Sequence, residues 1–126
     1  MIKVLSTEKA PKAIGPYSQA LEVNGMVFAS GQVPFDPQTG EIVGTTIEEQ
    51  ADRAIKSVGA ILEEAGIGYE NVVKTTCFLA NMDDFAKFNE VYAKYFTSKP
   101  ARSCVAVKTL PKNLLCEIEV IAAVEE

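Results

Sequence analysis

Residues 115–124 have the sequence LCEIEVIAAV, and this stretch decides the predicted fold because it specifies both faces of one long strand. Side chains along a strand point alternately to opposite faces. One set is wholly apolar and suits a position beneath helices: Cys116, Ile118, Val120, Ala122 and Val124. The other set is apolar with two carboxylates among its members: Leu115, Glu117, Glu119, Ile121 and Ala123.

Two amphipathic helices are predicted upstream of this strand. Thr46 and Glu49 have capping-box spacing, and Gly66 is placed to end the helix that follows. Its apolar residues recur every three or four positions: Ile47, Ala51, Ile55, Val58, Ile61, Leu62 and Ala65. A second helix is expected to begin after Asn81 or Asp83 and to end before Pro100. Its apolar stripe is Phe85, Phe88, Val91, Tyr92 and Tyr95.

The remaining segments predict short strands over residues 3–5, 17–23, 26–30, 71–80, 103–108 and 115–124. Asn24-Gly25 favours a tight hairpin turn between two of them. We expect the last two strands, joined through the Pro111–Asn113 turn, to form another hairpin. The order β-β-β-α-β-α-β-β predicts one α+β domain over residues 1–126, with both helices on one face of the sheet.

The face without helices carries much apolar surface in this prediction. In addition to the strand above, Met26-Val27-Phe28-Ala29 is apolar on both sides. Soluble proteins rarely leave such a face in water. We therefore expect this face to pack against another subunit.

Composition excludes several classes of chemistry. The chain has 126 residues, 12 of them basic and 17 acidic, for a formal net charge of −5. An acidic surface repels phosphate backbones, which disfavours nucleic-acid binding. Histidine is absent, which excludes Ser-His-Asp and Cys-His nucleophiles and the usual catalytic zinc ligands. Neither GxGxxG nor GKS/T occurs, so no motif predicts a nucleotide site.

Localisation and thiol state follow from simple patterns. The N-terminal residues lack the apolar stretch of a signal peptide, and no window approaches the roughly 18 apolar residues that a membrane span requires. We expect a soluble, cytoplasmic protein that binds no membrane. Cys77, Cys104 and Cys116 match neither a redox pair nor a zinc motif, so free thiols are expected.

Arg102 and Glu117 are the two residues best suited to chemistry. Arg102 opens a strand beside small residues, where its guanidinium can receive a carboxylate or phosphate; alternatively, it pairs with a surface acid. Glu117 and Glu119 share one side of an otherwise apolar strand, where burial raises a carboxyl pKa toward neutrality. The alternative is a structural ion pair with a partner subunit. The expected hairpin places Arg102 on the strand next to these glutamates.

Five other residues are weaker candidates. Cys104 is a nucleophile only if Arg102 or backbone dipoles activate it, and a core thiol is the competing interpretation. Tyr17 follows Gly15-Pro16 and can cap an apolar pocket. Ser30 and Gly31 end a strand in a turn, where a hydroxyl and free amides can meet a ligand. Asn89 on the second helix reaches a ligand or simply faces water.

Together these segments resemble the RidA (YjgF-like) family along the whole chain. The resemblance rests on residues 13–19 (AIGPYSQ), 29–34 (ASGQVP), 73–76 (VKTT), 88–92 (FNEVY) and 95–96 (YF). It continues through 100–105 (PARSCV), 110–111 (LP) and 117–119 (EIE). Cys116 departs from the aliphatic residue that is usual before the first glutamate of the last motif.

The resemblance implies a chorismate-mutase-like fold with a mixed β-sheet, and a homotrimer with clefts between adjacent subunits. It implies hydrolysis of reactive 2-imino acids, such as 2-iminobutanoate and 2-iminopropanoate, to 2-oxo acids and ammonia, with no metal or other cofactor. Arg102 would hold the substrate carboxylate and Glu117 would activate water. The backbone of Gly31 and Cys104 would contact substrate, and three side chains would shape the cleft: Tyr17, Ser30 and Asn89.

Other functions remain open at this point. A trimer that binds 2-oxo acids through Arg102 and signals to a partner needs no catalysis. The retention of both Arg102 and Glu117 favours the enzyme, because carboxylate binding alone needs only the arginine. Relatives described as ribonucleases or chaperones fit less well, since the chain is acidic, lacks histidine and is expected to bury its apolar face.

Overall fold

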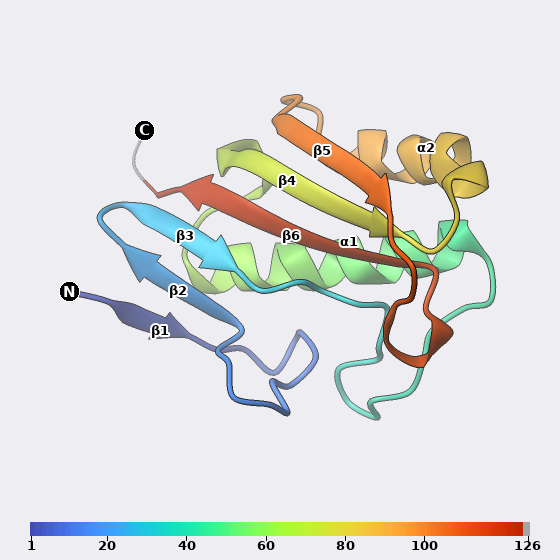
Figure 1. The fold of residues 1–126 in the computed structure, drawn as a ribbon. Coiled ribbons are helices and arrows are strands. Elements are labelled where there is room, and N and C mark those ends of the chain that lie inside the picture. Colours follow the sequence, from blue (N-terminus) through green and yellow to red (C-terminus); the bar gives the residue numbers. More distant parts are fainter. Residues whose placement is uncertain (125–126) are drawn as a thin grey trace.

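The computed structural model describes residues 1–124 and has the predicted order of elements (Figure 1). The strands are β1 (Lys3–Leu5), β2 (Ala20–Val23), β3 (Met26–Ala29), β4 (Val72–Leu79), β5 (Ala101–Ala106) and β6 (Cys116–Ala123). The α-helices are α1 (Ile47–Glu64) and α2 (Phe85–Tyr95). Short 3₁₀ turns precede β4, α2 and β6; they are η1 (Tyr69–Asn71), η2 (Met82–Asp84) and η3 (Pro111–Asn113).

The sheet has the strand order β1-β2-β3-β6-β4-β5, and this order corrects one prediction. β5 and β6 do not form a hairpin. β4 lies between them, antiparallel to β6 and parallel to β5. The chain between β5 and β6 therefore crosses over β4, and β6 lies in the interior of the sheet between β3 and β4. The mixed sheet itself is confirmed.

Local signals in the sequence correctly predict the turns and helix ends. Asn24 and Gly25 both have positive φ (52° and 75°), and they join β2 to its antiparallel neighbour β3. The capping box of Thr46 and Glu49 is present at the start of α1, and Gly66 follows the helix with a φ of +79°. The predicted strand from residue 17 begins later, at Ala20, because the Tyr17 amide donates to the Gly15 carbonyl in a tight turn.

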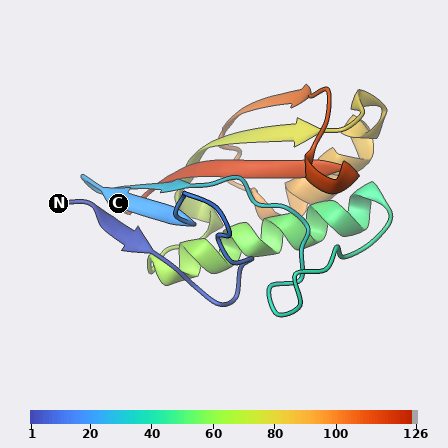
Figure 2. The same cartoon turned by 60° about the horizontal axis from the view of Figure 1, so that its bottom comes forward.

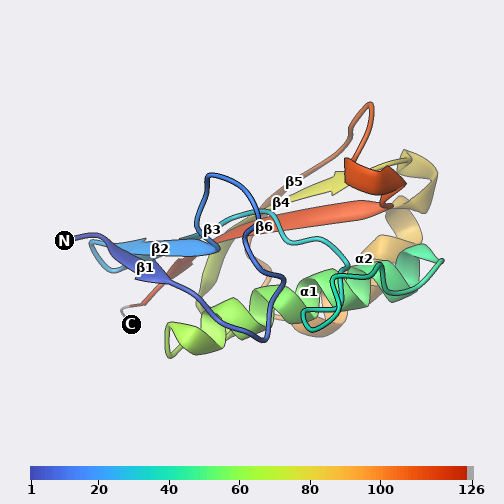
Figure 3. The same cartoon turned by 90° about the horizontal axis from the view of Figure 1, so that it is seen from below.

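Both α-helices lie on one face of the sheet, as predicted (Figures 2 and 3). The core lies between these two layers. From β6 it includes Cys116, Ile118, Val120 and Ala122, each at most 2% exposed. From the helices it includes the predicted stripes, among them Ile55, Val58, Leu62, Phe88 and Val91.

The opposite face of the sheet, here called the open face, is uncovered by any helix in residues 1–124 (Figure 3). One row of register partners across it is entirely apolar: Val4, Leu21, Phe28 and Ile121. Val4 and Phe28 are 63% and 44% exposed. No helix within the described residues is long and apolar enough to cross a membrane.

Candidate active site

Arg102 lies near the start of β5, at the edge of the sheet and on its helix side. Its register partner on β4 is Thr75, a fully buried residue that faces the helices. The Arg102 Nη1 donates a 2.7 Å hydrogen bond to the Asn89 Oδ1 of α2. The guanidinium carbon lies 4.7 Å from the ring centroid of Tyr92 and 5.4 Å from that of Phe85. The guanidinium is thus held by one amide and two aromatic rings.

The aromatic support of Arg102 is itself anchored in the core. The hydroxyls of Tyr92 and Thr75 share a 2.8 Å hydrogen bond. Because Thr75 on β4 is the register partner of Arg102, this hydrogen bond ties the ring of Tyr92 to the part of the sheet that carries the arginine. Arg102 and Asn89 line one cavity of about 490 Å³ together with Tyr92, Ala93, Phe96, Thr97, Lys99 and Pro100. A planar guanidinium at the mouth of such a cavity can take a carboxylate with two parallel bonds.

Glu117 lies on the open face of β6, beside Gly31. A Cβ at Gly31 would come within 2.0 Å of Glu117 Oε2, so a side chain at residue 31 would displace the carboxylate from this position. Two backbone hydrogen bonds hold the strands together at this point, from the Gln32 amide to the Ile118 carbonyl (2.7 Å) and from the Ile118 amide to the Gln32 carbonyl (3.0 Å). The backbone bridge between Gln32 and Ile118 therefore keeps Gly31 next to Glu117.

The surroundings of Glu117 favour the protonated form of its carboxyl. Partial burial, and then the negative charge of Glu119 two residues along the strand, raise the pKa of Glu117 above the usual range. A carboxylate with a raised pKa is a stronger base than an ordinary glutamate once it is ionised. This environment suits the removal of a proton from water near neutral pH.

Tyr17 and Ser30 lie on the same side of the molecule as Glu117. Tyr17 is 53% exposed, and with Gly31 it contributes to the lining of a cavity of about 320 Å³ next to Ile14, Val33 and Lys112. The hydroxyl of Ser30 donates to the Ser18 carbonyl (2.7 Å), and its amide donates to the Gln19 carbonyl (2.9 Å). Both polar groups of Ser30 thus bond within the protein, and its contact with a substrate stays a prediction.

The three cysteines are free thiols. Burial raises the pKa of Cys104, and the nearby guanidinium of Arg102 only partly opposes this shift. Burial also raises the pKa of Cys77 and of Cys116 to about 12. These thiols are protonated at neutral pH, which makes them weak nucleophiles. Within residues 1–124 no group of three acidic or cysteine side chains is arranged to hold a metal ion.

The structure does not bring Arg102 and Glu117 together within one protomer. Arg102 is in register with Thr75, and Thr75 with the buried Val120, so the arginine belongs to the helix side of the sheet. Glu117 is in register with Phe78 on the open face. The expectation that a hairpin would place the two residues side by side is therefore wrong. The site residues form two separate groups, which we call the arginine half-site (Arg102, Asn89, Cys104) and the glutamate half-site (Glu117, Gly31, Tyr17, Ser30).

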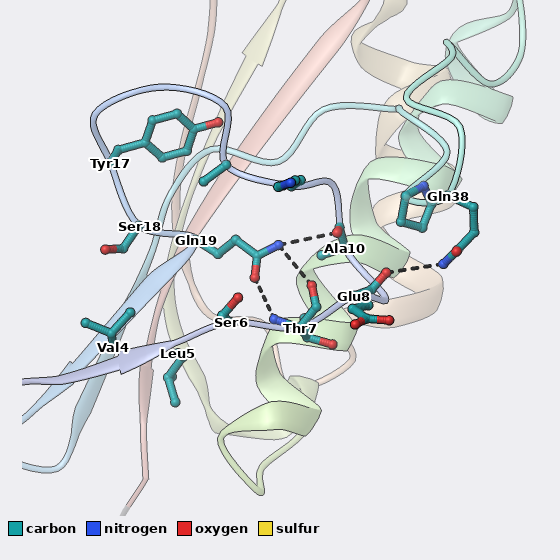
Figure 4. Close-up of a pocket in the computed structure, with 13 residues that line it drawn as sticks. Val4, Leu5, Ser6, Thr7, Glu8, Ala10, Tyr17, Ser18, Gln19 and Gln38 are labelled. Atoms are coloured by element: carbon teal, nitrogen blue, oxygen red, sulfur yellow. Dashed lines mark hydrogen bonds between the residues drawn. The ribbon is translucent and has the colours of Figure 1, made fainter.

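Sequence reasoning missed two supporting residues. Tyr92 was predicted only as part of an apolar stripe, yet its ring also contacts the guanidinium of Arg102. Gln19 was not singled out, although it is 5% exposed and its side-chain nitrogen donates to the carbonyls of Thr7 and Ala10 (Figure 4) and to that of Pro11. No sequence pattern marks Gln19, because its role depends on burial and on contacts with residues 7–11.

Comparison with known proteins shows which sequences and structures this chain is similar to. The model of a family described as endoribonuclease L-PSP matches residues 7–124. A RutC family protein of Pyrococcus abyssi is 56% identical over 95% of this chain and 95% of its own. The mouse protein named 2-iminobutanoate/2-iminopropanoate deaminase is 50% identical over 95% of this chain and 90% of its own. The crystal structure of E. coli TdcF with bound serine matches with a TM-score of 0.91 and 44% identity, over 96% of this chain and 98% of that chain.

Proposed function

This chain belongs to the endoribonuclease L-PSP family, which includes the YjgF, RutC and RidA proteins, and from this premise we propose that it is a deaminase of reactive 2-imino acids. It hydrolyses 2-iminobutanoate and 2-iminopropanoate to the corresponding 2-oxo acids and ammonia. Two findings support this choice of reaction. Relatives with 48–50% sequence identity are named for it, and the two half-sites contain a guanidinium that can receive a carboxylate and a carboxylate that can act as a base.

One observation carries the proposal. Arg102 and Glu117 lie on opposite faces of the sheet and are separated by β4, so one small substrate cannot reach both within a protomer. An active site that uses both residues must lie between two copies of the chain. The exposed apolar row on the open face supports such a contact. We propose a closed homotrimer, in which each of three clefts takes the arginine half-site of one protomer and the glutamate half-site of the next.

Arg102 binds the substrate carboxylate in this proposal. Its hydrogen bond to Asn89 and its contacts with Tyr92 and Phe85 fix the plane of the guanidinium before the substrate arrives. A substrate held by two parallel charge-assisted bonds has its C2 carbon in a defined position. The cavity beside Arg102 leaves space for such a ligand.

Glu117 is the general base. Its ionised carboxylate takes a proton from a water molecule while the water oxygen bonds to C2 of the protonated imine. The C=N π bond breaks onto nitrogen, which gives a tetrahedral 2-amino-2-hydroxy acid. The protonated Glu117 then returns the proton to the amine. As the C–N bond breaks and ammonia leaves, the Glu117 carboxylate takes the proton of the hydroxyl group, which becomes the carbonyl of the 2-oxo acid, and this proton passes to solvent. Because a protonated imine is already electrophilic, positioning and one base account for the chemistry.

The description of the family as endoribonucleases is less consistent with this chain. RNA binding is driven by contacts of basic groups with phosphates, whereas this protein has a net charge of −5. It also has no histidine for proton transfer at neutral pH.

The proposal is tested by a coupled assay. Threonine dehydratase generates 2-iminobutanoate, semicarbazide traps the free imine, and the protein is added in increasing amounts. We expect the trapped fraction to fall, and 2-oxobutanoate to rise, in proportion to protein concentration. If trapping is unchanged with imines of several amino acids, the deaminase proposal is wrong. Calorimetry with 2-oxobutanoate then decides whether the cleft is instead a sensor of 2-oxo acids.

A further inference from the structure

The side chain of Gln19 binds the segment of residues 7–11 to the loop that carries Tyr17 (Figure 4). Its side-chain oxygen accepts a 2.7 Å hydrogen bond from the Thr7 amide. Its side-chain nitrogen donates to the carbonyls of Thr7 (3.1 Å), Ala10 (3.3 Å) and Pro11 (2.8 Å). The residue is 5% exposed, so these bonds form away from solvent.

The backbone of Gln19 extends these links to the site. Its carbonyl accepts from the amide of Ser30, the residue before Gly31. The adjacent Ser18 carbonyl accepts from the Ser30 hydroxyl. Gly31 in turn lies against the carboxylate of Glu117. One glutamine thus connects the segment of residues 7–11 with the turn that leaves room for Glu117.

The segment of residues 11–17 depends on this anchor. Pro11 and Pro16 have no amide hydrogen to donate, which limits the backbone bonds that the segment can form. The segment passes from the helix side, where Lys9 pairs with Glu63 of α1 (3.4 Å), to the open side of the sheet (Figure 3). Tyr17 lies at the end of this passage, two residues before Gln19, and its ring stands on the loop beside the glutamine in Figure 4.

We propose that Gln19 is a positioning residue of the deaminase, which holds the Tyr17 segment and the Ser30-Gly31 turn in register and so sets the affinity for the imino acid. This inference rests on the proposed function. Gln19 lines the same cavity as Tyr17 and Gly31; it acts by holding these two residues in place and takes no part in proton transfer. Its loss leaves Glu117 on β6 as the base, so substrate binding weakens while the chemical step continues.

The experiment compares Gln19→Met with Gln50→Met in the full chain. Gln50 is a matched control because it is also 5% exposed, donates to the Gly44 carbonyl (3.1 Å) and accepts from the Leu115 amide (2.9 Å). Each substitution removes buried hydrogen bonds of one glutamine without changing charge, so both lower the melting temperature. We expect only Gln19→Met to raise KM for 2-iminobutanoate, by about tenfold, with kcat within about twofold of wild type.

The affinity for 2-oxobutanoate, measured by calorimetry, gives a second readout that does not require turnover. We expect it to fall with Gln19→Met and to be unchanged with Gln50→Met. Gln19→Asn, which keeps both polar groups on a shorter chain, replaces Gln19→Met if that variant does not fold. Equal KM values and equal affinities in the two variants overturn the inference, as does a loss confined to kcat. An inactive wild type instead overturns the proposed function, and the 2-oxobutanoate affinities alone then decide the role of Gln19.

Discussion

The two half-sites are built by different means. Arg102 is held by contacts: a hydrogen bond to Asn89 and two aromatic rings, one of them fixed by Thr75 in the core. The Glu117 carboxylate instead occupies the space that a side chain at Gly31 would take, on a face of the sheet that the helices leave uncovered. In the proposed trimer, one protomer therefore organises carboxylate binding by itself, whereas Glu117 meets the substrate only when a second protomer covers the open face.

Removal of the guanidinium should have the largest effect. Two charge-assisted hydrogen bonds are each worth roughly 1.5–3 kcal/mol, so we expect Arg102→Ala to lower kcat/KM about a thousandfold. Arg102→Lys keeps the charge but loses the planar fork, and it should recover only part of this loss. Steady-state kinetics on 2-iminobutanoate measure both variants. Activity of Arg102→Ala close to wild type would contradict the role of the arginine half-site.

Removal of the base should have the next largest effect. We expect Glu117→Gln to lower kcat about a hundredfold, because general-base catalysis typically contributes about 10²–10⁴-fold. Binding of 2-oxobutanoate, measured by calorimetry, should be retained because Arg102 is intact.

The raised pKa of Glu117 means that folding favours the protonated carboxyl, a contribution to stability that is lost as the pH rises through that pKa. At pH 7 the charge therefore lowers stability, and Glu117→Gln should melt at a higher temperature than wild type.

A smaller effect is expected from the neighbour of the base. The negative charge of Glu119 contributes to the raised pKa of Glu117. Glu119→Gln removes that charge, so the pKa of Glu117 should fall and the acid limb of the kcat/KM–pH profile should move to lower pH. The plateau rate should change by less than about twofold, since Glu119 does not contact substrate in this account. An unchanged acid limb would show that Glu119 does not tune the base.

The smallest effect is expected at Cys104. Its thiol is protonated at neutral pH because burial raises its pKa, and the proposed mechanism uses only its backbone. Cys104→Ser should therefore retain activity within about twofold of wild type. If Cys104→Ser folds but is inactive, the thiol has a chemical role, and the mechanism based on Glu117 is wrong.

The sequence predicts most of the local structure because the local signals are strong. The capping box at Thr46, the Asn24-Gly25 turn and the alternation over residues 115–124 each depend on neighbouring residues alone. The order of strands in the sheet depends instead on pairing between segments that are far apart in the sequence. The pattern in β5 and β6 gives no information on which strand lies between them, and a short connection through Pro111 is equally compatible with a hairpin and with a crossover.

The candidate site shows the same division. Arg102, Glu117 and Gly31 were proposed from residue type and family resemblance, and their contact with a substrate stays a prediction; Arg102 lines one cavity and Gly31 another. Their separation across the sheet was not predicted, because it follows from the position of β4. The supporting roles of Tyr92 and Gln19 depend on contacts between segments far apart in the sequence, which no local pattern encodes.

The central claim is that each active site is shared between two protomers, and a mixing experiment tests it directly. Arg102→Ala and Glu117→Gln proteins are unfolded, mixed in equal amounts and refolded together, with each variant refolded alone and wild type as controls. In a closed ring that assembles at random, about one quarter of the interfaces pair an intact Glu117 with an intact Arg102. We therefore predict about one quarter of wild-type activity from two inactive proteins. A mixture no more active than its components would show that the two residues do not share a site between protomers.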